Sequence, residues 1–246
     1  MDVRTFTVGP VQENCHFARR DGAREAIVID PGDEPERILG AIDALGLTVE
    51  AILLTHTHFD HVGAVAPVAR ATGAPVWCPE IEVPVLADIM SYVPWPGFGP
   101  FESYDADHTV TGGERLELAG LDIDVLFTPG HSPGHVTYGA REAATGGDGV
   151  AYGGGGTPAA IDAGAGGARK AGGGGGIHLF SGDVLFQGSI GRTDLPGGDA
   201  PTLMRSIATL LETFPDETAV YPGHMGNTTL GRERQSNPFL TELTRH

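Results

Sequence analysis

The 246-residue sequence predicts an α/β fold in which helices pack against sheets. Three observations predict this class. Short apolar segments typical of strands recur along the chain, segments with helical spacing separate several of them, and glycine or proline ends most elements. Hydrophobic residues make up 40% of the chain, and its length suits one α/β domain, so we expect a single domain over residues 1–246.

Strand and helix signals alternate in the first third of the chain. We expect Asp33 to be the N-cap of a helix that carries Pro35 in its first turn and stops at Gly46, because apolar residues recur at helical spacing in between. The other elements predicted here are antiparallel strands at 4–8 and 14–18, strands at 26–30, 49–55 and 75–78, and a helix at 62–72.

The remainder of the chain is more varied. Residues 91–104 form an irregular segment that is rich in aromatic residues, proline and glycine. Further strands are predicted at 115–119, 121–127, 136–140, 178–182 and 218–221, with a helix at 201–213.

One stretch is unlike the others, since residues 146–176 are about half glycine. Ordering such a segment costs much backbone entropy and buries little apolar surface. We predict a flexible insertion at about 143–177, inside a hairpin whose strands flank it. A lid or docking loop is the functional alternative.

The charge and the cysteines limit the partners and the compartment. A net charge of −17 repels phosphate backbones and anionic lipid, so we expect neither nucleic acid nor membrane as a partner. The sequence contains no apolar run of about 18 residues and no signal-peptide pattern at its start. Cys15 and Cys78 are the only cysteines, which makes a reducing cytoplasm the expected location. The oligomeric state stays open.

A cluster of metal-ligand types follows the predicted strand that ends at Thr55. The segment His56-Thr57-His58-Phe59-Asp60-His61 holds four of them within six residues. Imidazole nitrogen and carboxylate oxygen suit Zn²⁺, and also iron or manganese. In an extended stretch His56 and His58 share a side, whereas Asp60 and His61 diverge unless the chain turns. One loop can thus supply two neighbouring metals; a solvated histidine-rich turn is the alternative.

Three later residues occur in a matching context. His131, Asp183 and His224 each come after a short apolar strand that runs into glycine or proline. A rigid scaffold presents catalytic groups at strand ends of this kind. Together with the first cluster they give seven ligands, enough for two metals that share a carboxylate and a water.

These motifs resemble the metallo-β-lactamase superfamily, and within it the short bacterial form of the type II glyoxalases (hydroxyacylglutathione hydrolases). The resemblance covers nearly the whole chain except the glycine-rich insertion. It implies a four-layer αββα sandwich with the metals at the rim where the sheets meet. The segments that carry it are FTVGPVQENC, VIDPGD, LLTHTHFDHVGA, TPGHSPGH, FSGDVLFQGSIGRTDLPGGD and YPGHMGNTTLGRERQSNPFL.

The resemblance also implies an assignment of the ligands. His56, His58 and His131 would hold the first metal, Asp60, His61 and His224 the second, and Asp183 would bridge them with a hydroxide. The cofactors would be two divalent ions, Zn²⁺ foremost, with iron or manganese as alternatives. Among these residues Asp60, Asp183 and His131 are the predicted catalytic ones.

The implied reaction is hydrolysis of a small-molecule acyl thioester of the S-lactoylglutathione kind, by attack of the bridging hydroxide on the acyl carbonyl. Longer type II glyoxalases hold glutathione with a C-terminal helical extension, whereas only about 20 residues follow His224 here, so the thiol stays open. Persulfide dioxygenation with one iron at His56, His131 and Asp183 is the main alternative. Hydrolysis of a lactone or phosphodiester and a non-catalytic metal-binding module are the others.

Several further residues carry weaker hypotheses. We favour a supporting or packing role over metal ligation for His135. Arg192 and Asp194 form either a structural ion pair or a substrate contact. Five aromatic residues of the irregular segment either line a pocket or pack against one another. Four further histidines lie in no context typical of a metal ligand. The aromatic group is Tyr92, Trp95, Phe98, Phe101 and Tyr104, and the four histidines are His16, His108, His178 and His246.

Overall fold

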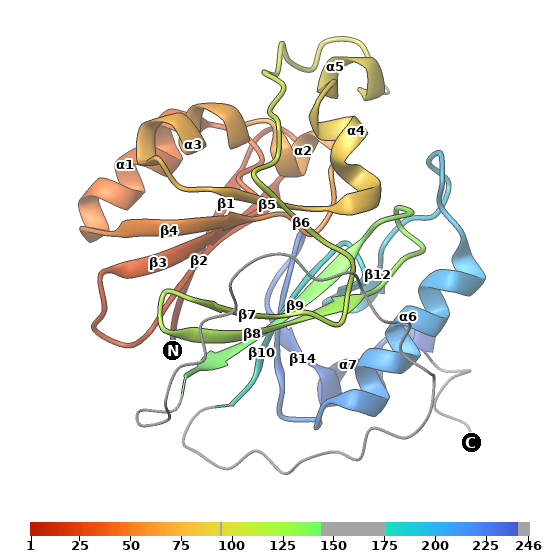
Figure 1. Ribbon diagram of the computed structural model, residues 1–246. Helices are drawn as coiled ribbons and strands as arrows, with labels where there is room; N and C mark the ends of the chain where they lie inside the picture. Colours follow the sequence, from red (N-terminus) through yellow and green to blue (C-terminus); the bar gives the residue numbers. More distant parts are fainter. Residues whose placement is uncertain (94, 144–175, 241–246) are drawn as a thin grey trace.

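Two six-stranded sheets face each other and carry helices on their outer faces, which gives four layers (Figure 1). The computed structural model describes residues 1–93, 95–143 and 176–240. The arrangement is the αββα sandwich that the resemblance implied. Most of the predicted insertion, residues 144–175, lies outside the described residues, as does any lid or docking role for it.

The first sheet begins with antiparallel pairs β1–β2 and β2–β3 and continues with parallel pairs to β6. Helices α1 (Pro35–Leu45) and α3 (Val65–Thr72) cover its outer face (Figure 1). Its strands are β1 (Asp2–Val8), β2 (Glu13–Arg19), β3 (Glu25–Ile29), β4 (Thr48–Leu53), β5 (Val76–Pro79) and β6 (His108–Val110).

The second sheet is antiparallel except where β10 pairs with β13 in parallel. Helices α6 (Ala200–Thr213) and α7 (Leu230–Ser236) lie on the side away from the first sheet (Figure 1). Its strands, in spatial order, are β14 (Thr228–Thr229), β13 (Ala219–Pro222), β10 (His178–Gly182), β9 (Val136–Glu142), β8 (Leu121–Phe127) and β7 (Arg115–Leu118). The short pair β11 (Leu185–Phe186) and β12 (Ser189–Ile190) stands apart.

Three apolar cores hold the layers together. Ile52 of β4 packs in the core beneath α1 and α3, while its neighbour Leu53 packs in the core between the sheets. Successive side chains of a strand point to opposite faces, so β4 must be apolar on both sides. A third core, with Leu203 and Ile207 of α6, closes the outer face of the second sheet.

Two predictions about the first helices were wrong. The N-cap of α1 is Glu34 rather than Asp33, because the Asp33 carboxylate accepts a local bond from the Glu34 amide at 2.7 Å. The predicted helix at 62–72 is interrupted: α2 (Phe59–Val62) ends before α3 begins. The Ala64 amide donates to the Pro31 carbonyl instead of continuing the helix.

Several short elements were not predicted. Between β5 and β6 lie η1 (Glu80–Glu82), α4 (Val83–Leu86) and α5 (Ile89–Tyr92), which are too short to show helical periodicity. After β13 the chain adds β14, α7 and η2 (Pro238–Leu240). In the part of the chain that the structure describes, no helix has the length and apolar character needed to cross a membrane.

One buried histidine makes the fold sensitive to acid. His16 of β2 places Nδ1 3.0 Å from Thr5 Oγ1 and Nε2 3.1 Å from the Pro222 carbonyl oxygen. Burial lowers its pKa to about 4, against the opposing effect of the bond to Pro222. A histidine in the unfolded chain titrates near ~6.5, so between these values the unfolded state binds more protons and acid destabilises the fold.

We predict that the free energy of unfolding of His16→Gln, measured against that of the parent, rises by roughly 2 kcal/mol when the pH falls from 7 to 5. Urea unfolding of both proteins at the two pH values measures this difference. His108→Gln, at an exposed histidine, is the matched control and should track the parent. A parent-to-variant difference that does not change with pH would contradict the prediction.

Candidate metal centre

The seven predicted ligands converge at one end of the sandwich, where strands of both sheets end. His56 follows β4, Asp183 follows β10, and His224 follows β13. His131 comes from the connection between β8 and β9. Because α2 starts right after His58, the chain turns there and sends Asp60 and His61 in a new direction.

The side chains form two groups. The ligand-type atoms of His56, His58 and His131 all lie within 4.8 Å of one another. The same limit holds for Asp60, His61 and His224. These are the two sets that the resemblance assigned to the first and second metal.

Asp183 stands between the groups. Its Oδ2 is 3.4 Å from His131 Nε2, and its Oδ1 is 3.4 Å from His61 Nε2. Oδ2 also lies 3.6 Å from His224 Nε2. One carboxylate thus faces both groups, as a bridging ligand must.

A buried network fixes the rings of His56 and His61 from behind. The Thr55 hydroxyl donates to Asp30 at 2.6 Å, so its oxygen accepts from His56 Nδ1 at 3.0 Å. His61 Nδ1 donates to the same Asp30 carboxylate at 3.1 Å. Asp30 therefore orients one histidine of each group, which sets the tautomer that leaves Nε2 for a metal. Asp30, His56 and His61 also cluster within 4.8 Å, but the bonds to Thr55 and His61 engage both Asp30 oxygens.

Backbone carbonyls do the same for two other rings. His131 Nδ1 donates to the Arg192 carbonyl at 2.8 Å, and His224 Nδ1 donates to the Gln12 carbonyl at 3.2 Å. In both rings Nε2 remains directed at Asp183. Four of the five histidines thus have one nitrogen anchored and the other facing the centre.

The donor set fits two divalent cations. His56 Nε2, His61 Nε2 and Asp183 Oδ1 are buried, and none has a hydrogen-bond partner among the described residues. A buried polar atom without a partner costs free energy, and two cations, one at each group, would satisfy all three. The mixture of imidazole nitrogen and carboxylate oxygen is typical of zinc, iron and manganese sites.

Burial and neighbouring charges shift the pKa values of the ligands in different directions. Burial lowers the pKa of His58 to about 4, and neighbouring His131 adds to the shift, so the ring is in the neutral form that binds metal. Burial disfavours the Asp183 carboxylate, yet the opposing charges of His61 and His131 hold its pKa well below the usual range. Burial opposes protonation of His61, but the Asp183 and Asp60 carboxylates raise the pKa of that ring well above its usual value, so a bound cation would displace its proton.

The close approach of the strand ends needs glycine. A Cβ on Gly223 would lie 2.4 Å from Asp183 Oδ1 and 2.6 Å from His61 Cε1. Such contacts are shorter than van der Waals packing allows, so any side chain there would push the bridging carboxylate aside. The glycine before His224 is therefore part of the site.

Three supporting carboxylates were missed from the sequence. Asp30 had the right signal, because it ends an apolar strand and precedes Pro31-Gly32, as the predicted ligands do. Glu13 is buried 3.8 Å from His61 Nδ1, and burial raises its pKa well above the usual range. Glu82 lies in a stretch of charged and apolar residues that gave no signal.

Glu82 links the two ligand loops. Its buried carboxylate accepts from Thr57 Oγ1, Ser132 Oγ and the Gly134 amide, each at 2.7 Å. Thr57 lies between two ligands of the first loop, and Ser132 follows His131. The carboxylate thereby ties the loops together without touching the ligand atoms themselves.

The weaker hypotheses are partly resolved. His135 Nε2 accepts the Asp183 amide at 3.1 Å, a supporting role. Arg192 and Asp194 form a two-pronged ion pair at 2.7 Å. His16, His108 and His178 lie outside the two ligand groups, and His246 lies outside the described residues.

The predicted aromatic group divides between both alternatives. Tyr92 and Trp95 line a cavity of about 650 Å³ whose floor includes His58, Asp60, His131, Asp183 and His224. Phe98 and Phe101 instead pack against Phe59, and Tyr104 packs against the first core.

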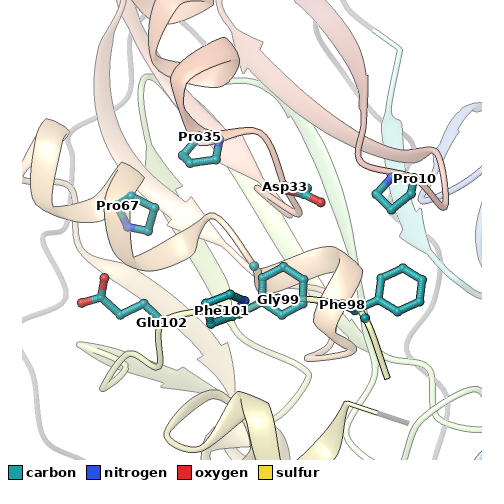
Figure 2. A pocket seen from close by; sticks show the side chains of 11 residues that line it. Pro10, Asp33, Pro35, Pro67, Phe98, Gly99, Phe101 and Glu102 are labelled. Atoms are coloured by element: carbon teal, nitrogen blue, oxygen red, sulfur yellow. The ribbon is translucent and has the colours of Figure 1, made fainter. Parts of the chain in front are cut away.

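Another cavity, of about 420 Å³, is lined by residues 97–102 of this aromatic segment. Figure 2 shows Phe98, Gly99 and Phe101 facing Pro10, Asp33 and Pro35, the first residue of α1. Its carboxylates are Asp33 and Glu102, and Glu102 is paired with Arg70 at 2.6 Å. None of the seven predicted ligands lines it, so it is not the candidate site.

Comparison with known proteins agrees with the geometry. The chain matches the model of the Metallo-beta-lactamase superfamily over residues 8–157 and 146–224. It is 36% identical over 245 residues to the probable metallo-hydrolase YqgX of Bacillus subtilis, with 98% of each chain covered. It is 33% identical over 242 residues to the hydroxyacylglutathione hydrolase GloC of Haemophilus influenzae, again with 98% of each covered.

Solved structures give the same answer. The BLEG-1 B3 metallo-beta-lactamase superposes with a TM-score of 0.78 at 35% identity, over 98% of this chain and 100% of that one. TTHA1623, solved in a di-iron-bound form, superposes with a TM-score of 0.72 at 38% identity, over 96% of this chain and 100% of that one. ETHE1 from Myxococcus xanthus superposes with a TM-score of 0.66 at 25% identity, over 97% of this chain and 84% of that one.

The chain therefore belongs to the metallo-β-lactamase superfamily. That membership supports a metal-dependent hydrolase that binds divalent metals, in agreement with the prediction from the sequence.

We predict that Glu82→Gln weakens metal binding without removing any ligand. An amide has one acceptor oxygen, so at least one of the three donors loses its partner, at a cost of about 1–3 kcal/mol in stability. Metal affinity should fall roughly 10- to 100-fold, because the loop of residues 56–61 and the loop that carries His131 both loosen. Competition with a metal-binding dye and thermal unfolding of the apoprotein measure the two effects.

Glu80→Gln, at an exposed glutamate two residues away, is the matched control and should match the parent in both assays. Metal affinity of Glu82→Gln equal to that of the parent would show that the carboxylate does not position the ligand loops.

Proposed function

We propose that this protein hydrolyses small-molecule acyl thioesters and uses neither nucleic acid nor membrane as a partner. The observation that carries the proposal is the single Asp183 carboxylate facing two three-residue ligand groups at the floor of an open cavity. The similarity to GloC, named as a hydroxyacylglutathione hydrolase, supports thioester chemistry.

The assignment of ligands follows the geometry. His56, His58 and His131 would hold one ion, Asp60, His61 and His224 the other, and Asp183 would serve both. Two divalent ions at such a site supply an activated water near neutral pH and polarise the carbonyl under attack. Zn²⁺ is our first candidate because it tolerates a thiolate leaving group; TTHA1623, solved with iron, supports iron as an alternative.

The chain's own residues then position substrate and move protons. Asp60 Oδ2 lies 3.3 Å from His224 Nε2 at the cavity floor, where it can accept a proton from the attacking water. Asp183 and His131 hold the floor in place. Cys15 and Cys78 are buried, and burial raises the pKa of both thiols, so neither is suited to act as a nucleophile.

Persulfide dioxygenation with one iron at His56, His131 and Asp183 is the second candidate. His131 Nε2 and Asp183 Oδ2 are 3.4 Å apart, and His56 shares the group of His131, so this triad is also assembled. The number of metals and oxygen uptake separate the two candidates.

We predict about two metal ions per chain by elemental analysis of protein purified without added metal, and hydrolysis of acyl thioesters that chelation abolishes. Asp183→Asn should reduce the metal content to one ion or fewer and lower kcat by roughly 100-fold or more, because the ligand between the groups loses its charge. Asp105→Asn, at an exposed carboxylate, is the control and should leave both values unchanged.

Two outcomes would count against the proposal. One iron per chain together with oxygen consumption on a persulfide would establish the dioxygenase. Two metals per chain without hydrolysis of any thioester would exclude thioesters as substrates.

A further inference from the structure

The cavity above the metal centre has a polar floor and apolar walls. One wall comes from the unpredicted helices between β5 and β6, with Val85 and Ile89, and from Trp95 just after them. A second wall, from β11 through residue 196, includes Phe186, Ile190 and Leu195. Ser91, Ser189 and Arg192 also line the cavity, but apolar side chains make up most of the lining away from the metal ligands.

The apolar character continues outward. Tyr92, Trp95 and Met225 line this cavity although they are 55%, 40% and 57% exposed. They are three of the seven large apolar side chains that the described part of the chain exposes. Exposed apolar side chains that gather around one cavity indicate a binding surface, whereas single scattered ones do not.

Positive charge in the walls is nearly absent. Among the described residues that line the cavity, Arg192 is the one arginine, and no lysine occurs. Its guanidinium is already held by both oxygens of Asp194 at 2.7 Å and lies 5.7 Å from the centre of the Trp95 ring. An unpaired arginine could bind a substrate carboxylate through two hydrogen bonds, but Arg192 already makes this contact with Asp194.

These features disfavour glutathione as the thiol. Glutathione carries two carboxylates, one ammonium and two peptide bonds. Each of these groups costs free energy when it leaves water on binding, unless it finds a hydrogen-bond or ion-pair partner in the cavity. Carboxylates need uncompensated cations, and the net charge of −17 adds long-range repulsion. The apolar walls instead gain free energy from a hydrocarbon group.

We propose that the substrate is an acyl thioester with a hydrocarbon group of four or more carbons on one arm, seated between Trp95, Ile89 and the Phe186–Leu195 wall. This inference rests on the proposed thioester hydrolysis and narrows its substrate class. The scissile carbonyl then lies over the ligand floor, and the hydrocarbon arm lies along the walls.

The test is a panel of uncharged thioesters given to the metal-loaded enzyme. One series varies the acyl group on N-acetylcysteamine from acetyl to hexanoyl, and the other varies the thiol from ethanethiol to hexanethiol with an acetyl group. In at least one series kcat/KM should rise roughly two- to fourfold per methylene. S-lactoylglutathione should react more slowly than the best member.

Variants locate the effect. Trp95→Ala and Met225→Ala should each lower kcat/KM for the longest substrate roughly 5- to 10-fold, and for the acetyl substrate less than about twofold. Phe239→Ala removes an aromatic side chain that is 52% exposed and does not line the cavity, so it should change neither. Flat profiles in both series, or a clear preference for the glutathione thioester, would overturn the inference.

A binding measurement separates this inference from the proposed reaction. S-alkyl thioethers of N-acetylcysteamine lack the scissile carbonyl and cannot be hydrolysed. Calorimetric affinity that increases from S-methyl to S-hexyl, and is lost in Trp95→Ala, would support the apolar cavity even if no thioester were cleaved. Affinity independent of chain length would refute it even if thioesters were cleaved.

Discussion

The buried Asp30 carboxylate is the interaction on which the centre depends. It receives Thr55 and His61 directly and His56 through the Thr55 hydroxyl, so it fixes rings from both ligand groups. In a low-dielectric interior each of these bonds is strong, and a missing partner is costly. As a result, the Nε2 atoms of His56 and His61 face the centre without a hydrogen-bond partner among the described residues, and a cation there would satisfy them.

Packing of the two sheets supplies the second constraint. Ligands from β4, β10 and β13 meet because the core between the sheets holds those strand ends in register, with Leu53 and Phe180 in the same apolar cluster. The Gly223 amide donates to the Gly182 carbonyl at 2.8 Å, which draws Asp183 and His224 together. The position of the ligands is therefore a property of the apolar core as much as of the polar residues.

The chemistry and the selectivity of the site come from different parts of the fold. The floor is built from strand ends that the sandwich must form in any case. The walls come from the segment after β5 and from the stretch between Asp183 and α6. Ile89 and Ile190 of these stretches pack in the outer cores, whereas Tyr92 and Trp95 belong to none of the three cores. Loops on a rigid scaffold can change without destabilising it, so wall residues can set the substrate while the floor keeps the reaction.

The sequence by itself determined the strand and helix alternation and the identity of the seven ligand-type residues, because apolar periodicity and strand-end motifs are local signals. The break between α2 and α3 and the role of Glu82 depended on tertiary structure. Ala64 bonds to Pro31, and Glu82 bonds to Ser132 and Gly134, across distances in the sequence that no local pattern encodes. Likewise Trp95 and Arg192 are far apart in the chain, and only folding makes them neighbours at one cavity.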